Sequence, residues 1–194
     1  MNHQPELIII AGPNGAGKTT FVNTYLPEYT NVREFVNADL IAKGMSPFDS
    51  EGVQIEACKI FLNRVRQLIE SRTSFSFEST LSGKTHIALI KAARANGYAV
   101  RLYFIYLNSV SLSLERIAER VGRGGHDVPS DIVVRRYGRS LRNLIADYLP
   151  LVDDWQLFDN SDNSFREIAR ELSEERFVAD EVLFNHLIDE YGNH

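Results

Sequence analysis

The sequence has few cysteines, no long apolar run and no basic leader. Cys58 is the one cysteine among 194 residues, so an internal disulfide framework is excluded and a reducing compartment is favoured. We expect Cys58 to be a small buried helix residue, with a reactive thiol as the alternative. No apolar run reaches the roughly 18 residues of a membrane span. Residues 1–6 lack basic character, and Leu7–Ala11 is too short for a signal sequence. These absences predict a cytoplasmic protein without a membrane anchor.

Positive charge is also scarce, with 21 Lys and Arg against 26 Asp and Glu and a net charge of −5. The exception is the segment Glu115–Arg142, which holds seven arginines and four acidic residues. Its local charge is +3, which leaves −8 for the rest of the chain. This distribution argues against general nucleic-acid binding and predicts one local anion site.

Length and apolar content favour one domain with a sizeable core, since 44% of the residues are hydrophobic. Short apolar runs alternate with segments of helical periodicity along the chain, a pattern typical of a parallel sheet between helices. The five predicted strands are Leu7–Ala11, Val32–Val36, Ser74–Phe77, Val100–Leu107 and Trp155–Phe158. The predicted helices are 51–71, 84–96, 110–121, 131–147, 163–172 and 178–191. We therefore predict an α/β fold with a five-stranded, mostly parallel sheet and helices on both faces.

The segment Gly12–Thr19 fits the phosphate-loop pattern G-x-x-x-x-G-K-[ST] without a mismatch. An apolar strand precedes it and a helical pattern follows, as the motif requires. In such a loop the backbone amides surround a phosphate, the lysine reaches the β- and γ-phosphates, and the hydroxyl binds magnesium. The alternative is a plain glycine-rich turn. The expected ATP-binding residues are Gly12, Pro13, Asn14, Gly15, Ala16, Gly17, Lys18, Thr19 and Thr20, with Thr19 as the metal ligand.

Two further absences narrow the class of nucleotide-binding protein. The chain has no N-K-x-D signature for guanine, which disfavours a GTP switch, and it is too short for most motors. No apolar run ends in a clear Walker-B aspartate, a feature that small-molecule kinases often lack because their substrate site supplies carboxylates. The sequence therefore favours a small-molecule kinase.

Ligands of an open parallel sheet bind at the carboxyl ends of its strands. Asn37 and Asp39 follow the second predicted strand, and Glu78 and Thr80 follow the third. Asp39 is our candidate general base, with a helix N-cap as the alternative. Glu78 and Thr80 are candidates for contacts with substrate hydroxyls, although Thr80 or Ser82 could instead cap the next helix.

The arginine-dense segment 115–142 opens as a helix, breaks at three glycines and resumes after Pro129. This helix–loop–helix pattern is typical of a lid that closes over transferring phosphate and excludes water. The alternative is a solvated helix with Glu–Arg pairs. The candidate phosphate ligands are Arg116, Arg120, Arg123 and Arg136.

The ordered motifs AGPNGAGKTT, NADLI, FESTLSG, RGGHDVP and DNS resemble the zeta toxin family of P-loop kinases. They span Ile8–Ser161. The resemblance implies one P-loop kinase domain over residues 1–194, with ATP and Mg2+ as cofactors, and transfer of phosphate to a nucleotide-sugar hydroxyl, such as that of UDP-N-acetylglucosamine. It also implies a small helical antitoxin as partner. The open alternatives are a kinase for another hydroxyl compound and a non-catalytic ATP-binding module. The roles carried over are catalysis for Asp39, Lys18, Arg120 and Arg123, and substrate binding for Asn37, Asp39, Glu78, Thr80, Arg116 and Arg136.

Overall fold

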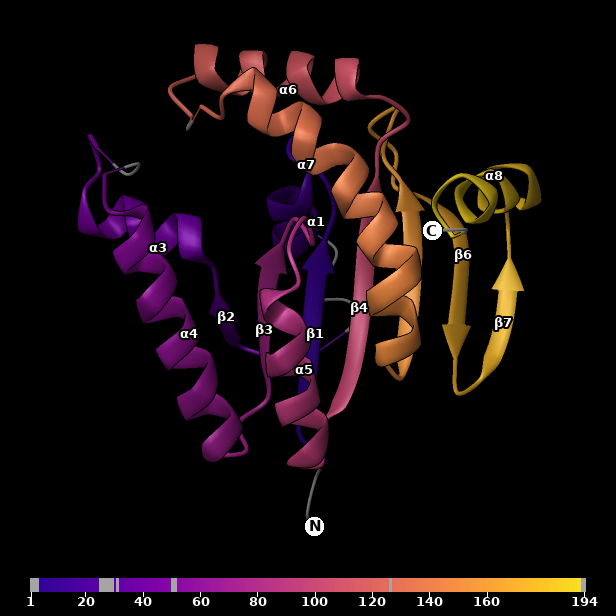
Figure 1. Cartoon of the computed structure of the whole chain (residues 1–194), viewed down its shortest axis with the longest axis horizontal. Coiled ribbons are helices and arrows are strands. Elements are labelled where there is room, and N and C mark those ends of the chain that lie inside the picture. Colours follow the sequence, from indigo (N-terminus) through magenta and orange to yellow (C-terminus); the bar gives the residue numbers. More distant parts are fainter. Residues whose placement is uncertain (1–3, 25–29, 31, 50–51, 126, 193–194) are drawn as a thin grey trace.

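The computed structural model describes residues 4–24, 30, 32–49, 52–125 and 127–192 (Figure 1). Within these residues the chain forms one seven-stranded sheet in the order β2-β3-β1-β4-β5-β6-β7. The strands from β2 to β5 pair in parallel, and β6 and β7 are antiparallel. The strands are β1 (Glu6–Ala11), β2 (Glu34–Val36), β3 (Phe75–Ser79), β4 (Ala99–Tyr106), β5 (Asp154–Asp159), β6 (Arg166–Leu172) and β7 (Glu175–Val178).

The five predicted strands are confirmed, but the prediction of a five-stranded sheet is wrong, because β6 and β7 extend it to seven strands. The prediction of a helix over 163–172 is also wrong. That segment forms β6, in which the consecutive residues Ile168 and Ala169 are both buried. A bulge explains this, because Leu157 pairs with Ala169 while Phe158 pairs with Glu167, leaving Ile168 between them. The bulge breaks the alternation that identifies a strand in a sequence, so the segment mimics a helical period.

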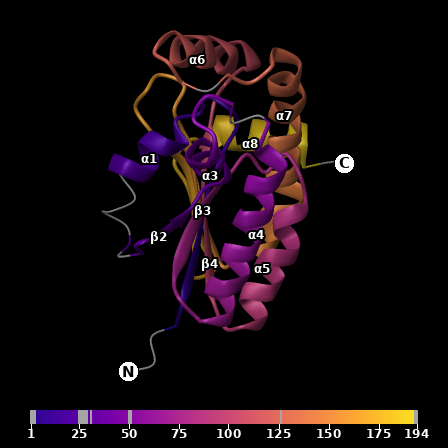
Figure 2. The same ribbon diagram turned by 90° about the vertical axis from the view of Figure 1, so that its left-hand side faces the viewer.

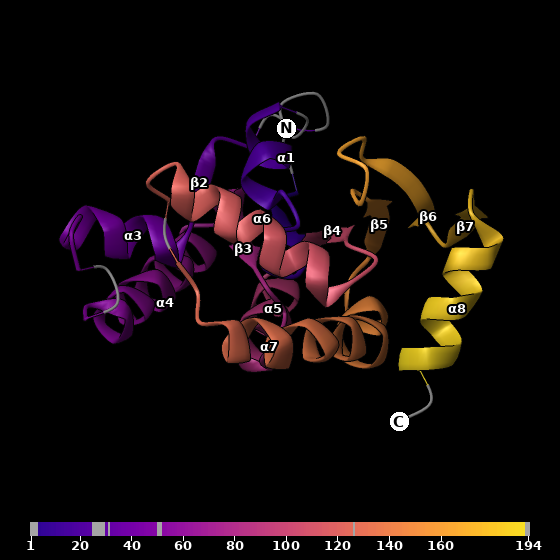
Figure 3. The ribbon, with the colours of Figure 1, turned by 90° about the horizontal axis from the view of Figure 1, so that it is seen from above.

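The described helices lie on both faces of the sheet, with α1 on one face and α4, α5 and α7 on the other (Figures 2 and 3). The helix α6 lies across the carboxyl ends of the central strands (Figure 1). No helix among the described residues is long and apolar enough to cross a bilayer. The helices are α1 (Lys18–Thr24), α3 (Ala38–Met45), α4 (Gln54–Glu70), α5 (Thr85–Ala95), α6 (Val110–Gly122), α7 (Ser130–Asn143) and α8 (Glu181–Tyr191), with a π-helical turn at Leu144–Tyr148 and a 3-10 turn at Leu149–Leu151.

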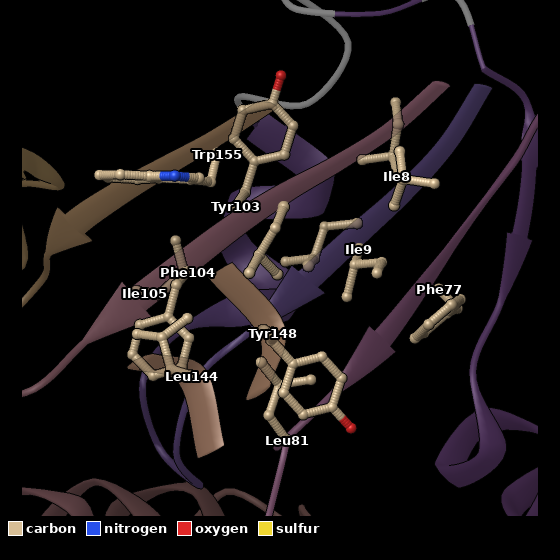
Figure 4. Close-up of a cluster of buried hydrophobic side chains, with 14 of the residues drawn as sticks. Ile8, Ile9, Phe77, Leu81, Tyr103, Phe104, Ile105, Leu144, Tyr148 and Trp155 are labelled. Atoms are coloured by element: carbon tan, nitrogen blue, oxygen red, sulfur yellow. The ribbon is translucent and has the colours of Figure 1, made fainter. Parts of the chain in front are cut away.

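The core is centred on β1, whose residues Leu7–Ala11 are fully buried. Figure 4 shows that side chains from neighbouring strands and from the turn Leu144–Tyr148 meet in this core. Burying apolar side chains on both faces accounts for the continuous apolar run of the first strand. Cys58 differs from the expectation, because it is exposed on α4. The buried positions of that helix fall on another face, at Ala57, Phe61 and Val65.

A second, smaller apolar cluster lies between α6 and α7. Ile117, Val128 and Val133 form it, and Leu114 and Ile132 pack against it. It is separate from the main core. The segment predicted to be a lid therefore has an apolar centre of its own.

Candidate active site

In the loop between β1 and α1, Gly12 and Gly17 occupy positions where a Cβ atom would clash with neighbouring atoms. Gly12 has φ 146°, and a Cβ there would lie 2.3 Å from the Ile105 carbonyl oxygen. Gly17 has φ 88°, and its Cβ would lie 2.6 Å from Nδ2 of Asn160. Larger residues would meet both a left-handed backbone and fixed neighbours. This geometry is that of a phosphate loop, and a plain surface turn would not need it.

Two side chains from distant segments hold this loop in place. Ser113 of α6 donates from Oγ to the Asn14 carbonyl at 2.9 Å. Asn160, just after β5, donates from Nδ2 to the Ala16 carbonyl at 2.9 Å. The sequence motif D-N-S contains Asn160, but its role in shaping the loop is visible only once the strand ends converge.

Lys18 is buried and surrounded by oxygen atoms. Its Nζ donates to the carbonyls of Gly12 and Pro13, each at 3.0 Å, and lies 3.8 Å from Oε1 of Glu78. Burial lowers the pKa of Lys18, while Glu78 and Asp39 oppose that shift. The ammonium group is therefore positioned at the loop with an anionic partner beside it.

Glu78 links the loop to the second strand end. Its Oε2 accepts hydrogen bonds from Oγ1 of Thr19 at 3.2 Å and from Nδ2 of Asn37 at 3.1 Å. Glu78 is the penultimate residue of β3 and pairs in register with Ile10 of β1. Its carboxylate therefore lies near the carboxyl end of β3, directly beside the strand that leads into the loop. No Walker-B aspartate is predicted from the sequence, and the carboxylate near the end of this neighbouring strand is that of Glu78.

Asp39 lies in the first turn of α3, near the loop. The N-cap of α3 is Asn37, whose Oδ1 accepts from the amides of Asp39 at 2.8 Å and Leu40 at 3.2 Å. The alternative interpretation of Asp39 as the N-cap is therefore wrong. Gln54 of α4 donates from Nε2 to Oδ1 of Asp39 at 3.3 Å.

The turn after β3, residues 80–83, is held by α7 and the π-helical turn that follows it. Ser140 donates from Oγ to the Thr80 carbonyl, Asn143 donates to the Leu81 carbonyl at 2.7 Å, and Tyr148 donates to the Gly83 carbonyl at 2.7 Å. We call these three residues the α7 clamp. Hydrogen bonds to three carbonyls of one short turn fix this irregular segment.

Within the turn, Thr80 does not cap the following helix. Its hydroxyl lies 2.9 Å from that of Ser82. The N-cap of α5 is Lys84, which makes no side-chain capping bond. The capping alternatives for Thr80 and Ser82 are therefore wrong.

A cavity of about 310 Å³ joins these groups. Its polar wall brings together residues from the phosphate loop, the two strand ends and the lid. Its far wall is more apolar and includes Phe61, Leu62 and His86. The predicted site residues that line it are Asn14, Gly15, Lys18, Asn37, Asp39, Glu78, Thr80, Arg120 and Arg136.

His86 on the far wall is neutral at ordinary pH. Its Nδ1 lies 3.0 Å from Oγ of Ser79, and its ring packs on Phe61 and Phe77. Burial lowers its pKa to about 4. The far wall therefore offers rings and one polar nitrogen, with no positive charge from this histidine.

The predicted lid arginines separate into different positions. Arg136 and Arg120 line the cavity, and Arg120 also lines, with Arg123, a groove beside Gly15, Gly17 and Thr20. Arg116 lines the same groove, but its Nη2 donates to the carbonyls of Asn160 at 2.7 Å and Ser161 at 3.1 Å. His126 in the RGGHDVP motif lies outside the described residues.

Thr19 and Glu78 fit a magnesium site in a nucleotide complex. Hydroxyl and carboxylate oxygens are hard ligands of the kind Mg2+ prefers, alongside phosphate and water. Among the described residues, no group of three or more His, Cys, Asp or Glu side chains could hold a metal. The donor set therefore suits a cation that arrives with ATP.

The chain resembles known proteins over most of its length. A family model described as Zeta toxin matches residues 1–171. An uncharacterized protein of Haemophilus influenzae is 34% identical over 134 residues, which cover 69% of this chain and 94% of that protein.

Solved structures share the fold. A chain in the crystal structure of AvrRxo1-ORF1:-ORF2 with ATP superposes with a TM-score of 0.77 at 21% identity, covering 96% of this chain and 64% of that one. A chain from the PezAT toxin–antitoxin system of Streptococcus pneumoniae gives 0.69 at 18% identity, with coverage of 100% and 80%. This chain thus spans less than two thirds of the first of these two chains.

Proposed function

Because the chain belongs to the zeta toxin family, we propose that it is an ATP-dependent kinase that phosphorylates a sugar hydroxyl of a nucleotide sugar such as UDP-N-acetylglucosamine. The observation that carries this proposal is the single cavity lined by Lys18 of the phosphate loop and by Asp39 opposite it. Phosphoryl transfer requires mainly alignment and charge neutralisation, with a carboxylate to receive the acceptor proton. A cavity with both groups supplies these requirements.

ATP binds with its phosphates in the loop from Gly12 to Thr20. The loop amides and Lys18 hold the β- and γ-phosphates, and Thr19 ligates Mg2+. Glu78 accepts a hydrogen bond from Thr19, so its carboxylate lies beside the proposed magnesium site. Glu78 also lines the cavity, where it is a candidate contact for an acceptor hydroxyl. When bound, Mg2+ neutralises charge on the phosphates.

Asp39 receives the proton of the acceptor hydroxyl. The acceptor oxygen forms a bond to the γ-phosphorus, the bond to the β–γ bridging oxygen breaks, and ADP leaves with the electron pair. Thr80 and Arg136 on the cavity wall are the proposed contacts for the acceptor. Asn37 was predicted to bind substrate as well, but its amide is already engaged by Glu78 and by α3.

Arg120 stabilises the transferring phosphoryl group, since it lines the cavity next to both Lys18 and Asp39. Arg123, in the neighbouring groove, contacts the nucleotide side. Arg116 was a candidate for phosphate, and its bonds to the carbonyls after β5 give it the role of anchoring α6. The lid excludes water that would otherwise hydrolyse ATP.

A small helical antitoxin is the proposed partner. The observation behind it is exposed apolar surface beside the site: Leu40, Met45 and Phe48 are 54%, 38% and 103% exposed. Leu40 and Phe48 line a hollow that also contains Thr19 and Arg120. A helix bound there would block the nucleotide.

Incubation with radiolabelled ATP, Mg2+ and a panel of nucleotide sugars, followed by mass spectrometry, tests the proposal. We expect one nucleotide sugar to gain a phosphate. Phosphorylation of a different hydroxyl compound in the same assay would favour the alternative kinase. ATP binding without phosphorylation of any compound in a cell extract would favour a non-catalytic module.

A further inference from the structure

Asn37 occupies an unusual place between the donor and acceptor sides of the site. Its side chain is 8% exposed and makes hydrogen bonds at both ends. The Nδ2 group donates to Glu78, and Oδ1 accepts from the amides of Asp39 and Leu40. A substrate contact through Oδ1, or through the N–H donated to Glu78, would therefore require breaking one of these bonds.

The sheet register explains why one side chain can reach both carboxylate-bearing segments. Val36, the last residue of β2, pairs with Phe77 of β3, so Asn37 and Glu78 follow adjacent positions on neighbouring parallel strands. The chain turns into α3 directly after Asn37, which brings the amide of Asp39 to the other end of the same side chain. A single planar amide thus spans the two segments.

We propose that Asn37 is a positioning residue that couples the magnesium-facing carboxylate Glu78 to the base Asp39. This inference rests on the proposed function and deepens it. The Glu78 carboxylate also accepts from Thr19, so the hydrogen-bonded path runs from the phosphate loop to the first turn of α3. Asn37 therefore sets the direction of Asp39 relative to the bound phosphates.

The kinetic test is Asn37→Ser. Serine is a good N-cap, so α3 retains its cap, but its side chain is too short to donate to Glu78. We expect phosphoryl transfer to fall about tenfold, with ATP affinity within about threefold of wild type and an acceptor KM nearly unchanged, because loss of alignment reduces kcat. A fall in ATP affinity equal to the fall in kcat would overturn the coupling.

A merely structural role for Asn37 would act through the stability of α3, and Gly44→Ala separates the two possibilities. A Cβ at Gly44 meets nothing within 4 Å, and alanine stabilises a helix interior relative to glycine. Added to Asn37→Ser, it should raise Tm by about 1–3 °C while leaving transfer low. Recovery of transfer together with Tm would contradict the positioning role.

A double-mutant cycle identifies the residue through which Asn37 acts. In an Asp39→Asn background, Asn37→Ser should change the residual transfer by less than about twofold, since the base is already absent. A full tenfold loss in that background would show that Asn37 acts elsewhere.

Amide exchange measured by NMR tests the coupling without any assay of activity. Glu78→Ala removes the carboxylate that accepts from Nδ2 of Asn37 and from Thr19, and it leaves the Oδ1 cap of α3 chemically unaltered. We expect exchange of the Asp39 and Leu40 amides to accelerate about threefold or more. The control Thr85→Ala, at the cavity rim on α5, should leave both rates unchanged. Unaltered exchange in Glu78→Ala would overturn the coupling even if the protein proves to be a kinase, and accelerated exchange would support it even if no acceptor is found.

Discussion

The phosphate-loop side and the acceptor side of this cavity are built in different ways. The loop joins β1, which is fully buried at Leu7–Ala11, to α1, and glycines at Gly12 and Gly17 are forced by fixed neighbours. The acceptor side combines α3, the turn after β3 and the lid, and the lid packs around its own small apolar cluster. The donor side therefore rests on the central strand of the main core, whereas the acceptor side combines parts of that core, such as Leu81 and Phe61, with the separate apolar cluster of the lid. We therefore expect substitutions in the lid to alter acceptor binding more than ATP binding.

The largest expected effect lies on the donor side. Lys18→Ala removes the ammonium at the loop, and we expect nucleotide affinity to fall about 10-fold or more and transfer about 10³-fold. Calorimetric titration with ATP and Mg2+ and a phosphorylation assay measure the two quantities. Lys91→Ala, an exposed lysine of α5, is the matched control. If Lys18→Ala binds ATP and transfers phosphate as the wild type does, the interpretation of Gly12–Thr19 as a phosphate loop is wrong.

Substitutions in the lid should lower the rate of phosphoryl transfer more than the affinity for ATP. The loss of rate should be larger for Arg120 than for Arg123. Arg120 lines both the cavity and the neighbouring groove, whereas Arg123 lines the groove. We expect Arg120→Ala to lower kcat by about 10²-fold, as expected for lost charge stabilisation in the transition state, and Arg123→Ala to act mainly on ATP affinity. Steady-state kinetics separate kcat from KM, with the exposed Arg135→Ala as control. Equal kcat values for Arg120→Ala and Arg135→Ala would contradict the assignment.

The α7 clamp should matter only on the acceptor side. Tyr148→Phe removes the hydrogen bond to the carbonyl of Gly83, and because Gly83 is an exposed residue to which water has access, the expected cost is about 1 kcal/mol of unfolding free energy. We expect a raised acceptor KM with unaltered ATP affinity. Tyr191→Phe, on α8, provides a tyrosine control away from the turn. An equal loss of ATP affinity in Tyr148→Phe would show that the two sides are not separate.

The smallest effect concerns pH and stability. His86 has a pKa of about 4 in the folded protein, below the ordinary 6.5. The unfolded state therefore binds an extra proton between these values, so stability falls as pH drops from 6.5 to 4, by up to about 3 kcal/mol. His86→Asn removes this titration, and its urea-unfolding free energy should fall less over that pH range than that of wild type. Parallel pH profiles for the two proteins would contradict the shift.

Local patterns in the sequence were sufficient for the donor side. The phosphate loop is a contiguous motif, and the apolar run before it identifies the buried strand. The position of Glu78 near the end of a strand was also predictable from the sequence, but the strands on either side of it were not. Whether that strand lies beside the loop strand depends on the order of the strands in the sheet, which pairing between distant segments determines.

Non-local features account for what the sequence did not predict. The bulge at Ile168 breaks the alternating pattern of β6, so the sequence of that strand resembles a helix. On α4, the exposed Cys58 directly follows the buried Ala57, and a sequence alone does not show which of two neighbours faces the core. The bonds of Asn160 and Ser113 to the loop join segments about 100 or more residues apart. Such contacts depend on the tertiary structure, which cannot be predicted from the periodicity and composition of the sequence.

We propose that one cavity joins a nucleotide-binding side, at Lys18, to a separate acceptor-activating side, at Asp39. The most direct measurement takes Asp39→Asn and determines its affinity for ATP with Mg2+ and its rate of phosphoryl transfer in the same preparation. We expect affinity within about threefold of wild type and transfer lowered by about 10²–10⁴-fold, the range typical of a lost general base. Transfer at the wild-type rate would contradict it.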